Sequence, residues 1–354
     1  MGRYVNGLVK RYTRYGPNID LVEGFEVVLP SGEITRVGSM AYAETDFGPF
    51  YRYITGPDLV GLFTKSNGAF GIVTKVAYQC LHRPKCWAFH SYYWSVGQIE
   101  DFTKAVMEIT AAEVFESHFN DKWRFVSGLP PDCHFILKLV VNAENQLELK
   151  GKEQAVEEIC ETHGGTYLPQ FCEDIYTRWP TIFHLGQVPS VLSVAVRRKD
   201  KATFIYILDE LIYPTSAFPE VYNKILEVCK THGFDSPRKP MIDGYPMKHL
   251  VISSQTQLEI EVYKPYLVSQ FYKCQDEFRK WYGKKGGQFQ YKFPPLVPDY
   301  CWTNQLSTLN LLRQIKGLLD PNNILSPGTF ELGRHYESGF SRQVSAKKDR
   351  SKRF

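Results

Sequence analysis

Strand-like and helix-like segments alternate between residues 86 and 300, and this alternation limits the folds open to the chain. Segments rich in β-branched and aromatic residues lie at 88–96, 133–141 and 190–198. Segments with apolar residues at helical spacing lie at 99–115, 146–164, 201–211 and 219–233. This mixture predicts an α+β domain, in which amphipathic helices pack on a sheet.

Two segments of this region echo each other: EEICETHGG at 157–165 and LEVCKTHGF at 226–234. Both place Cys, Thr and His directly before a glycine at a predicted helix end, where glycine adopts the left-handed conformation without strain. Either they are the helix ends of two related βαβ-like halves, which favours a ferredoxin-like α+β domain, or Thr-His-Gly is simply a common helix stop.

The residues on either side of this region have their own pattern. Residues 25–29 and 34–38 predict a hairpin around a Ser-Gly turn, and a short helix near residue 60 should end at Asn67 and Gly68. Alternating residues after Gly71 predict a strand. A last helix is expected over 307–319, followed by an Asp-Pro break and a segment that closes a domain.

The net charge of +4 belongs to the end of the chain. Residues 334–354 contain seven Lys or Arg and two acidic residues, a net charge of +5, which leaves −1 for everything before them. We expect a basic disordered tail. The sequence contains no helix-turn-helix, RNA-recognition or zinc-finger pattern, so nucleic-acid binding is not expected.

Several protein classes are excluded by composition. No apolar run approaches the roughly 20 residues of a membrane helix, and the first 16 residues lack an apolar signal core. The eight cysteines are scattered without a C-x-x-C pair, and none of the nine histidines lies in a metal-binding pattern. We therefore expect a cytoplasmic protein with reduced thiols, no membrane span and no metal site.

The glycine-rich stretch 66–74, SNGAFGIVT, is a candidate binding loop. Gly68 and Gly71 would let the backbone approach a flat or anionic group, whose atoms the neighbouring amides could bind. The same spacing is also typical of a helix stop followed by a tight turn, which the spacing alone favours.

Two polar residues of the middle region are candidates for substrate contact. His249 begins the predicted strand pair 249–263, which is more typical of an exposed strand face but is open to a substrate role. Arg178 could clamp a carboxylate or phenolate with its bidentate guanidinium, or lie on the surface at a strand end.

Three segments, taken in order, carry a family resemblance: residues 15–39 (YGPNIDLVEGFEVVLPSGEITRVGS), 56–84 (GPDLVGLFTKSNGAFGIVTKVAYQCLHRP) and 320–330 (DPNNILSPGTF). They resemble the FAD-linked oxidases, the family of vanillyl-alcohol oxidase, p-cresol methylhydroxylase and the glycolate oxidase flavin subunit. The first two are similar to the second half of a PCMH-type FAD-binding domain, and the third is similar to its C-terminal return segment.

The resemblance implies a domain organisation. Residues 1–85 would be a partial FAD-binding domain, and residues 86–300 a ferredoxin-like α+β cap that binds substrate. Residues 301–333 would return to the FAD domain, before the tail at 334–354. Family members also have a glycine-rich loop that binds the FAD pyrophosphate, and nothing in this sequence corresponds to it. We therefore expect a fragment, a companion polypeptide that carries the missing half, a homo-oligomer, or a protein that has lost flavin binding.

The resemblance also implies FAD as the cofactor and a set of site residues. In the family the GIVT segment contacts FAD largely through backbone groups. The cofactor-binding residues expected in this chain are Tyr15, Gly16, Gly68, Gly71, Ile72, Val73, Asn322 and Asn323. The residues expected to contact substrate are His249, Arg178 and Tyr263.

The predicted function is the C-terminal part or subunit of an FAD-dependent oxidoreductase, which oxidises a phenolic alcohol or a 2-hydroxy acid by hydride transfer to flavin. Residues 246–255, PMKHLVISSQ, lack the GDGNxH metal segment of the hydroxy-acid branch. The sequence of residues 56–75 resembles the phenol-oxidising branch more than the hydroxy-acid branch. The alternative is a non-catalytic, flavin-free subunit that binds and positions partner proteins.

Overall fold

The computed structural model describes residues 11–82, 84–112, 114–121, 129–169, 203–235, 240–261, 264–289, 302 and 304–332. The chain divides into two compact units. Unit 1 comprises residues 1–8, 19–81 and 291–354, and unit 2 comprises residues 9–18 and 82–290. None of the helices within the described ranges is long and apolar enough to cross a membrane.

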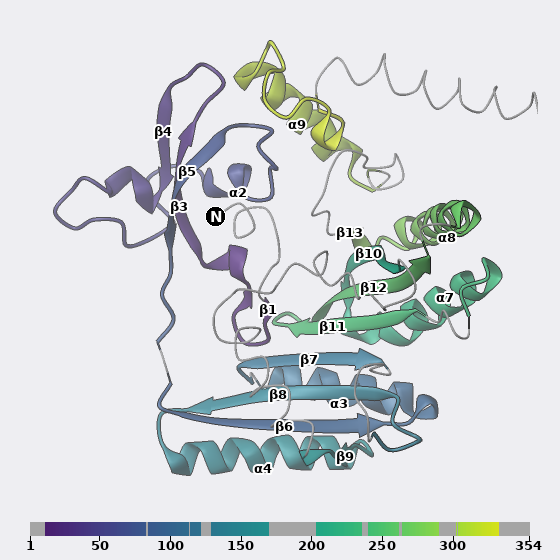
Figure 1. Ribbon diagram of the computed structural model, residues 1–354. Coiled ribbons are helices and arrows are strands. Elements are labelled where there is room, and N and C mark those ends of the chain that lie inside the picture. Colours follow the sequence, from purple (N-terminus) through teal and green to yellow (C-terminus); the bar gives the residue numbers. More distant parts are fainter. Residues whose placement is uncertain are drawn as a thin grey trace, which may run out of the picture. The chain divides into compact units, whose positions relative to one another are not determined.

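Unit 1 contains a three-stranded antiparallel sheet in the order β4-β3-β5 (Figure 1). Its strands are β3 (Val22–Val28), β4 (Ile34–Gly38) and β5 (Ile72–Tyr78), and its helices are α2 (Val60–Phe63) and α9 (Leu306–Leu319). Phe25 and Val27 of β3 pack into a buried core with residues of both helices, while Glu26 between them points to the other face. The predicted hairpin, the strand after Gly71 and the last helix are confirmed.

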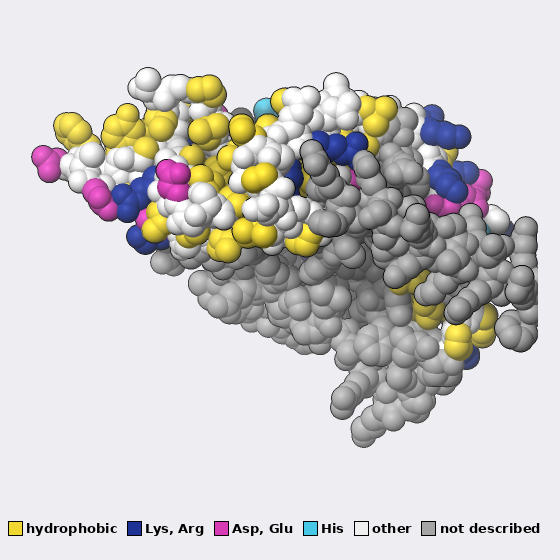
Figure 2. All heavy atoms as spheres, turned by 90° about the horizontal axis from the view of Figure 1, so that it is seen from above, with side chains coloured by type: hydrophobic (Ala, Val, Ile, Leu, Met, Phe, Trp, Pro, Cys, Tyr) yellow, Lys and Arg dark blue, Asp and Glu magenta, His cyan; other side chains and the backbone are white. Residues whose placement is uncertain are grey.

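Unit 1 exposes many large apolar side chains. Phe47 is 89% exposed and Phe50 is 71% exposed, and both lie in the loop that precedes α2. Further exposed apolar side chains of this unit are Ile34, Tyr42, Tyr51, Tyr53, Leu59, Ile72, Tyr78, Leu306, Leu311, Leu318 and Ile324. Figure 2 shows hydrophobic side chains spread over much of the described surface seen from above.

Unit 2 is built on an eight-stranded antiparallel sheet in the order β13-β10-β12-β11-β7-β8-β6-β9. Its strands are β6 (Cys86–Trp94), β7 (Glu116–Asp121), β8 (Phe135–Ala143), β9 (Thr166–Tyr167), β10 (Thr203–Pro214), β11 (Met241–Met247), β12 (Val251–Glu261) and β13 (Gln288–Phe289). Its helices are α3 (Ile99–Ala111), α4 (Gln146–Thr162), α7 (Phe218–Thr231) and α8 (Pro265–Lys284). The helices cover one face of the sheet (Figure 1), where alternate strand residues join the main apolar core.

The sheet is a duplicated ferredoxin-like arrangement. The element orders β6-α3-β7-β8-α4-β9 and β10-α7-β11-β12-α8-β13 match, and each half has its strands in the spatial order second, third, first, fourth. The halves join where Gly244 of β11 lies opposite Phe119 of β7. A Cβ on Gly244 would lie 2.0 Å from Phe119 Cζ, so one large side chain fills this junction and its partner must be glycine.

The remaining elements are short. Strands β1 (Arg11–Tyr12) and β2 (Gly16–Pro17) form a small hairpin in unit 2, where the hydroxyl of Thr13 accepts a hydrogen bond from the amide of Ser117 at 2.7 Å. Single 3-10 turns lie at Asn18–Leu21, Ser39–Tyr42, Val96–Gln98, Thr215–Ala217 and Thr329–Glu331.

Two predictions of local structure in unit 2 were wrong, and one helix was missed. Residues 201–211 were predicted as a helix, but residues 203–211 belong to strand β10. This strand is buried on both faces over residues 208–211 and has apolar residues at both parities, which is why it resembled a helix. Within 249–263, predicted as a strand pair, residues 251–261 form one long strand, β12, which pairs with β10 on one side and β11 on the other. The helix α8 was not predicted, and the predicted strand 190–198 lies outside the described residues.

The two echoing segments do end helices, as predicted. Gly164 after α4 and Gly233 after α7 both have the left-handed conformation, with φ of +74° and +79°. However, α4 is the second helix of its half and α7 is the first helix of the other. The echo therefore marks a shared helix stop, while the duplication itself is visible in the strand order.

Candidate functional site

The glycine-rich turn of unit 1 is held in an unusual backbone conformation. Lys65, Asn67 and Gly68 all have positive φ, at 58°, 49° and 76°. The predicted helix end at Asn67 and Gly68 was wrong, because α2 already ends at Phe63. Asparagine and glycine tolerate positive φ far better than other residues, so Asn67 and Gly68 form the turn that leads the chain into β5.

Lys316 ties this turn to the C-terminal segment. Its side chain is only 2% exposed, and its Nζ donates to the Ala69 carbonyl at 2.8 Å, to Asp320 Oδ2 at 2.6 Å and to the Leu325 carbonyl at 2.6 Å. The carboxylate of Asp320 also accepts the backbone amides of Ile324 and Leu325. Burial opposes ionisation of Asp320, but the hydrogen bonds from Lys316 and these amides lower its pKa overall. We call these five residues the Lys316 cluster.

The two glycines of the turn serve the protein's own packing. A Cβ on Gly71 would lie 2.3 Å from Val27 Cγ1, and one on Gly68 would lie 3.0 Å from the Ser326 hydroxyl. That hydroxyl donates to the Asn67 carbonyl at 2.9 Å, which adds a further link between the two motifs. Packing around the turn therefore accounts for both glycines, which does not prevent their backbone groups from contacting a ligand.

The other residues expected near a cofactor in unit 1 differ in exposure. Ile72, at the start of β5, is 55% exposed, Val73 is half-buried, and Asn322 is exposed. The side-chain oxygen and nitrogen of Asn323 are both buried and make no hydrogen bond to the described part of the chain. A buried amide without partners costs about 1–3 kcal/mol, so a ligand offering a donor and an acceptor fits here.

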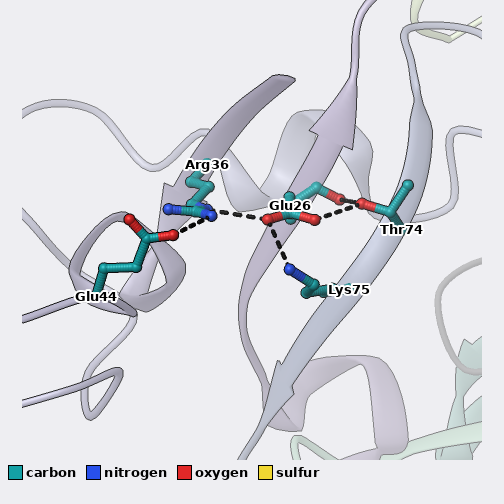
Figure 3. Close-up of polar contacts among 5 residues, drawn as sticks. All are labelled: Glu26, Arg36, Glu44, Thr74 and Lys75. Carbon is teal, nitrogen blue, oxygen red and sulfur yellow. Dashed lines mark hydrogen bonds and ion pairs between the residues drawn. The ribbon is translucent and has the colours of Figure 1, made fainter.

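Charged side chains lie on the other face of the unit 1 sheet (Figure 3). Glu26 accepts hydrogen bonds from Arg36 Nε at 3.0 Å, Lys75 Nζ at 3.1 Å and the Thr74 hydroxyl at 3.0 Å, and Arg36 also pairs with Glu44. The Lys75 and Arg36 hydrogen bonds lower the pKa of Glu26. This network joins the three strands, and it includes two residues of the GIVTK segment.

Unit 2 carries a second candidate site on the sheet face that the helices leave uncovered. Strand register aligns polar residues in two rows across the central strands. The first row contains Glu210, Gln255, Asp243 and Asn120, from β10, β12, β11 and β7. The second row contains Ser253, Tyr245, His118 and Lys138, from β12, β11, β7 and β8. We call these residues, with Gln257 and Glu116 of the same face, the polar face.

Hydrogen bonds connect the polar face. Asp243 accepts from Asn120 Nδ2 at 3.3 Å and from Gln257 Nε2 at 3.1 Å, and Asn120 Oδ1 accepts from Lys138 Nζ. The ring of His118 stacks on Tyr245, with centroids 4.3 Å apart and an interplanar angle of 14°. All of the charged residues of this face are more than nine-tenths buried, so they need hydrogen-bond or charge partners within the protein.

An aromatic cluster adjoins the polar face on the same side of the sheet. Ile136 and Val140 of β8 form a small core with half-buried aromatic side chains. These are Trp87, Phe89, Tyr93 and Phe115. The rings of Trp87 and Phe115 meet edge to face, with centroids 5.0 Å apart. A polar patch and an aromatic patch therefore lie side by side.

Of the predicted substrate residues, the structure describes only His249. His249 is exposed in the turn between β11 and β12. Arg178 and Tyr263 lie outside the described residues. Tyr15 and Gly16 lie in unit 2, where the Tyr15 ring contacts Phe115 with centroids 6.1 Å apart.

Sequence reasoning missed the polar face, although a signal was present. In β7 every residue except Phe119 is polar, and in β11 Asp243 and Tyr245 are two residues apart, so that both strands place polar side chains on one face. Several polar residues in strands that lie at the centre of a sheet are the signal that indicates a functional face. Within the described residues, no group of three or more His, Cys, Asp or Glu side chains could hold a metal ion.

Comparison with known proteins identifies the family. The model of the family described as FAD linked oxidases, C-terminal domain, matches residues 96–249 and 298–330, more than half of the chain. The chain belongs to the FAD-linked oxidases. FAD is the cofactor of this family, as the resemblance implied.

Two curated relatives align over a short part of the FAD-linked oxidase chain. The 4-cresol dehydrogenase [hydroxylating] flavoprotein subunit of Pseudomonas putida is 33% identical over 73 residues, and glycolate oxidase subunit GlcD of Bacillus subtilis (strain 168) is 36% identical over 75 residues. Each alignment covers 21% of this chain and 14% of the relative.

Solved structures share the fold over most of the chain. The 4-ethylphenol oxidase from Gulosibacter chungangensis, in its isoeugenol complex, matches with a TM-score of 0.74 at 16% identity, covering 94% of this chain and 70% of that one. A p-cresol methylhydroxylase with substrate bound matches with a TM-score of 0.69 at 14% identity, covering 94% and 68%. The predicted fold class, part of a PCMH-type FAD-binding domain with a ferredoxin-like cap, is confirmed.

Proposed function

We propose that this FAD-linked oxidase chain is the C-terminal part or subunit of an FAD-dependent oxidoreductase that oxidises a phenolic alcohol or a 2-hydroxy acid. The observation that carries the proposal is the polar face: an ordered, buried set of donors and acceptors beside an aromatic cluster, in a chain of a flavin-linked family. Such a combination of apolar walls and few fixed polar groups is typical of small-molecule sites.

The two units would have different tasks. Unit 2 would bind the substrate, with the polar face contacting its hydroxyl group and the aromatic cluster contacting its ring. Flavin, when bound, supplies the hydride acceptor. His118 is the residue of the polar face best suited to take the hydroxyl proton, because a neutral imidazole is a base near neutral pH and its ring is fixed against Tyr245.

Unit 1 would contribute to cofactor binding. The residues that we assign to it are Gly68, Gly71, Ile72 and Val73 through their backbone groups, and Asn322 and Asn323 through their side chains. The Lys316 cluster fixes the glycine-rich turn and the segment around Leu325 relative to each other. Asn323 is assigned to cofactor binding because its buried side-chain amide makes no hydrogen bond to the described part of the chain.

We also propose a companion for unit 1. Its exposed apolar side chains, with Phe47 and Phe50 foremost, suit contact with further polypeptide, and this polypeptide would carry the part of the FAD domain that binds the pyrophosphate. The same exposed surface favours the second candidate function, a flavin-free subunit that binds partner proteins.

Flavin binding separates the two functions. The chain, purified with any protein that accompanies it, should have flavin absorbance or take up added FAD, and an aromatic alcohol should reduce that flavin without oxygen. Replacing Asn323 by alanine should weaken FAD uptake more than replacing the exposed Asn322. A preparation with its companion present that neither contains nor takes up flavin would rule out the enzyme and leave the binding subunit.

A further inference from the structure

We propose that Cys229 and Cys274 are a peroxide-sensitive thiol pair, which hydrogen peroxide converts into a disulfide that joins α7 to α8. The proposal is independent of the proposed function, because it uses neither the polar face nor the flavin. It also gives a role to one of the two echoing segments, LEVCKTHGF at 226–234, which contains Cys229.

The two sulfur atoms are already in contact. The thiol of Cys274 donates a weak hydrogen bond to the sulfur of Cys229, and the two Sγ atoms are 3.8 Å apart. Of the six cysteines that the structure describes, these are the two whose sulfurs touch. A disulfide has an S–S distance of about 2.05 Å, so the two sulfurs need to approach each other by only about 1.8 Å.

The thiol pair is buried, but it lies at a helix end and close to the surface. Both side chains are 0% exposed, so a reagent reaches them only when α7 and α8 open locally. Cys229 belongs to the last turn of α7, which ends at Thr231, and helix ends open more easily than helix centres. His232 and Glu277, each three residues further along the chain, form a partly exposed ion pair at 2.8 Å. Hydrogen peroxide is small and uncharged, so a local opening of this end is enough.

The first half of the sheet has the same motif without a second sulfur. Cys160 of α4 is also 0% exposed, and His163 after it pairs with Glu108 of α3 at 2.9 Å. The helix α3 contains no cysteine. The duplicated fold therefore repeats the contact between its two helices, but the second half has a cysteine on each helix, which makes Cys160 a matched control.

The oxidation takes place in two steps. Cys229, as the thiolate, attacks one oxygen of hydrogen peroxide and becomes a sulfenic acid, and the hydroxide released leaves as water with the proton that the thiol has lost. The sulfur of Cys274 then attacks the sulfur of Cys229, the S–O bond breaks, and the hydroxyl group leaves as a second water with the proton of Cys274. Two thiols thus lose two electrons, and one peroxide is reduced to two waters.

The surroundings of Cys229 set the pace of the first step. The hydrogen bond from Cys274 and burial both raise the pKa of Cys229, so the thiolate is scarce at neutral pH. The reaction should therefore be slow in the folded protein and become faster as the pH rises.

The disulfide would close a covalent loop around part of the sheet. Strands β11 and β12 lie between Cys229 and Cys274 in the sequence, and α7 packs against α8. A cross-link of this kind stabilises a protein mainly by restricting the unfolded chain. The melting temperature of the oxidised protein should rise by about 5 °C and return to its starting value after reduction.

Peptide mapping tests the proposal on the full chain, together with any flavin and companion with which it purifies. The folded protein is treated with hydrogen peroxide, the remaining thiols are alkylated, and the chain is digested with trypsin without reductant. The peptides ILEVCK (225–230) and CQDEFR (274–279) should then be joined, with the sum of their masses less two hydrogen atoms. Dithiothreitol should separate them.

Three alanine variants show which cysteines are responsible. Cys229→Ala and Cys274→Ala should each abolish both the joined peptide and the rise in melting temperature. Cys160→Ala, at the matching position of the first half, should change neither. Mapping of the wild-type protein needs no variant, so the test remains decisive if one of them fails to fold.

Three results would overturn the proposal. The first is a folded protein in which peroxide oxidises the exposed Cys80 while Cys229 and Cys274 remain thiols. The second is a joined peptide that forms only after urea has unfolded the chain. The third is Cys229 oxidised to a sulfinic acid without a bond to Cys274.

Discussion

Replacing Lys316 by methionine should strongly destabilise unit 1. The change removes three hydrogen bonds of 2.6–2.8 Å and leaves the carboxylate of Asp320, which is 1% exposed, without its cation. Removing one partner of a buried ion pair costs about 3–5 kcal/mol. That is a large part of the roughly 5–15 kcal/mol by which a typical domain is stable.

The chain offers a matched control on α8. Asp276 and Lys280 have the same i, i+4 spacing and the same N–O distance of 2.6 Å, but their side chains are 52% and 60% exposed. Exposed pairs of this kind contribute about 0.5 kcal/mol or less. Lys280→Met should therefore lower the free energy of unfolding by only a small fraction of the loss in Lys316→Met.

Urea unfolding would measure the loss in the free energy of unfolding. Hydrogen exchange of peptides that cover residues 64–78 and 320–332 would show whether the backbone of these two segments loses protection. Both peptides should lose protection together in Lys316→Met, because the lysine joins them. Adding Asp320→Asn should recover part of the loss, since it neutralises the stranded charge. A loss below about 1 kcal/mol, well under the range for a broken buried pair, or equal losses at Lys316 and Lys280, would refute the reasoning.

Three further predictions concern packing and pH. Gly71→Ala should lower the free energy of unfolding by about 1–3 kcal/mol, because its Cβ would overlap Val27 and approach Phe63. Gly317→Ala on α9 places its Cβ in open space and should stabilise the helix by up to about 1 kcal/mol. Urea unfolding of both variants compares the two effects. Lys75 and Arg36 lower the pKa of Glu26, so its carboxylate stabilises the fold fully above its unfolded pKa and loses that contribution as the pH falls through its folded pKa. The melting temperature of Glu26→Gln should therefore depend less on pH across the acidic range than that of the wild type. An unchanged pH profile would contradict this. Burial raises the pKa of Asp209 to about 6 despite its pairing with Arg279, so the folded state binds the carboxyl proton of Asp209 more tightly than the unfolded chain does. The contribution of Asp209 to stability should therefore decrease as the pH rises from about 4 to about 6. Melting temperatures of Asp209→Asn over the same pH range should lack that decrease.

Local signals account for the part of the fold that could be predicted. The helix stop at Gly164 depends on the backbone of one residue, and the hairpin around Gly32 depends on a single turn. Patterns inside one segment reveal such features. The misprediction of residues 201–211 has the same origin, because a strand buried on both faces lacks the alternation that distinguishes it from a helix.

The sites could not be predicted in the same way, because they depend on register between distant segments. Asn120 and Asp243 are 123 residues apart in sequence, and Lys316 binds the carbonyl of a residue 247 positions earlier. In the sequence Lys316 is one more lysine in an amphipathic helix. Only the close approach of the glycine-rich turn makes it the centre of a cluster.

The duplication of unit 2 explains why the functional residues gather at the middle of the sheet. Two ferredoxin-like halves each cover one face of their strands with helices, and joining β7 to β11 removes two strand edges that would otherwise be open to other chains. The junction cannot be symmetric in its side chains, because Phe119 needs Gly244 opposite it. The same asymmetry extends along both strands: β7 supplies His118 and Asn120, while β11 supplies Tyr245 and Asp243. The two halves thus share one fold but place different polar side chains on their two central strands, β7 and β11. Neighbouring strands on both sides hold the backbone of β7 and β11 in place, so polar side chains on these strands can be positioned most rigidly.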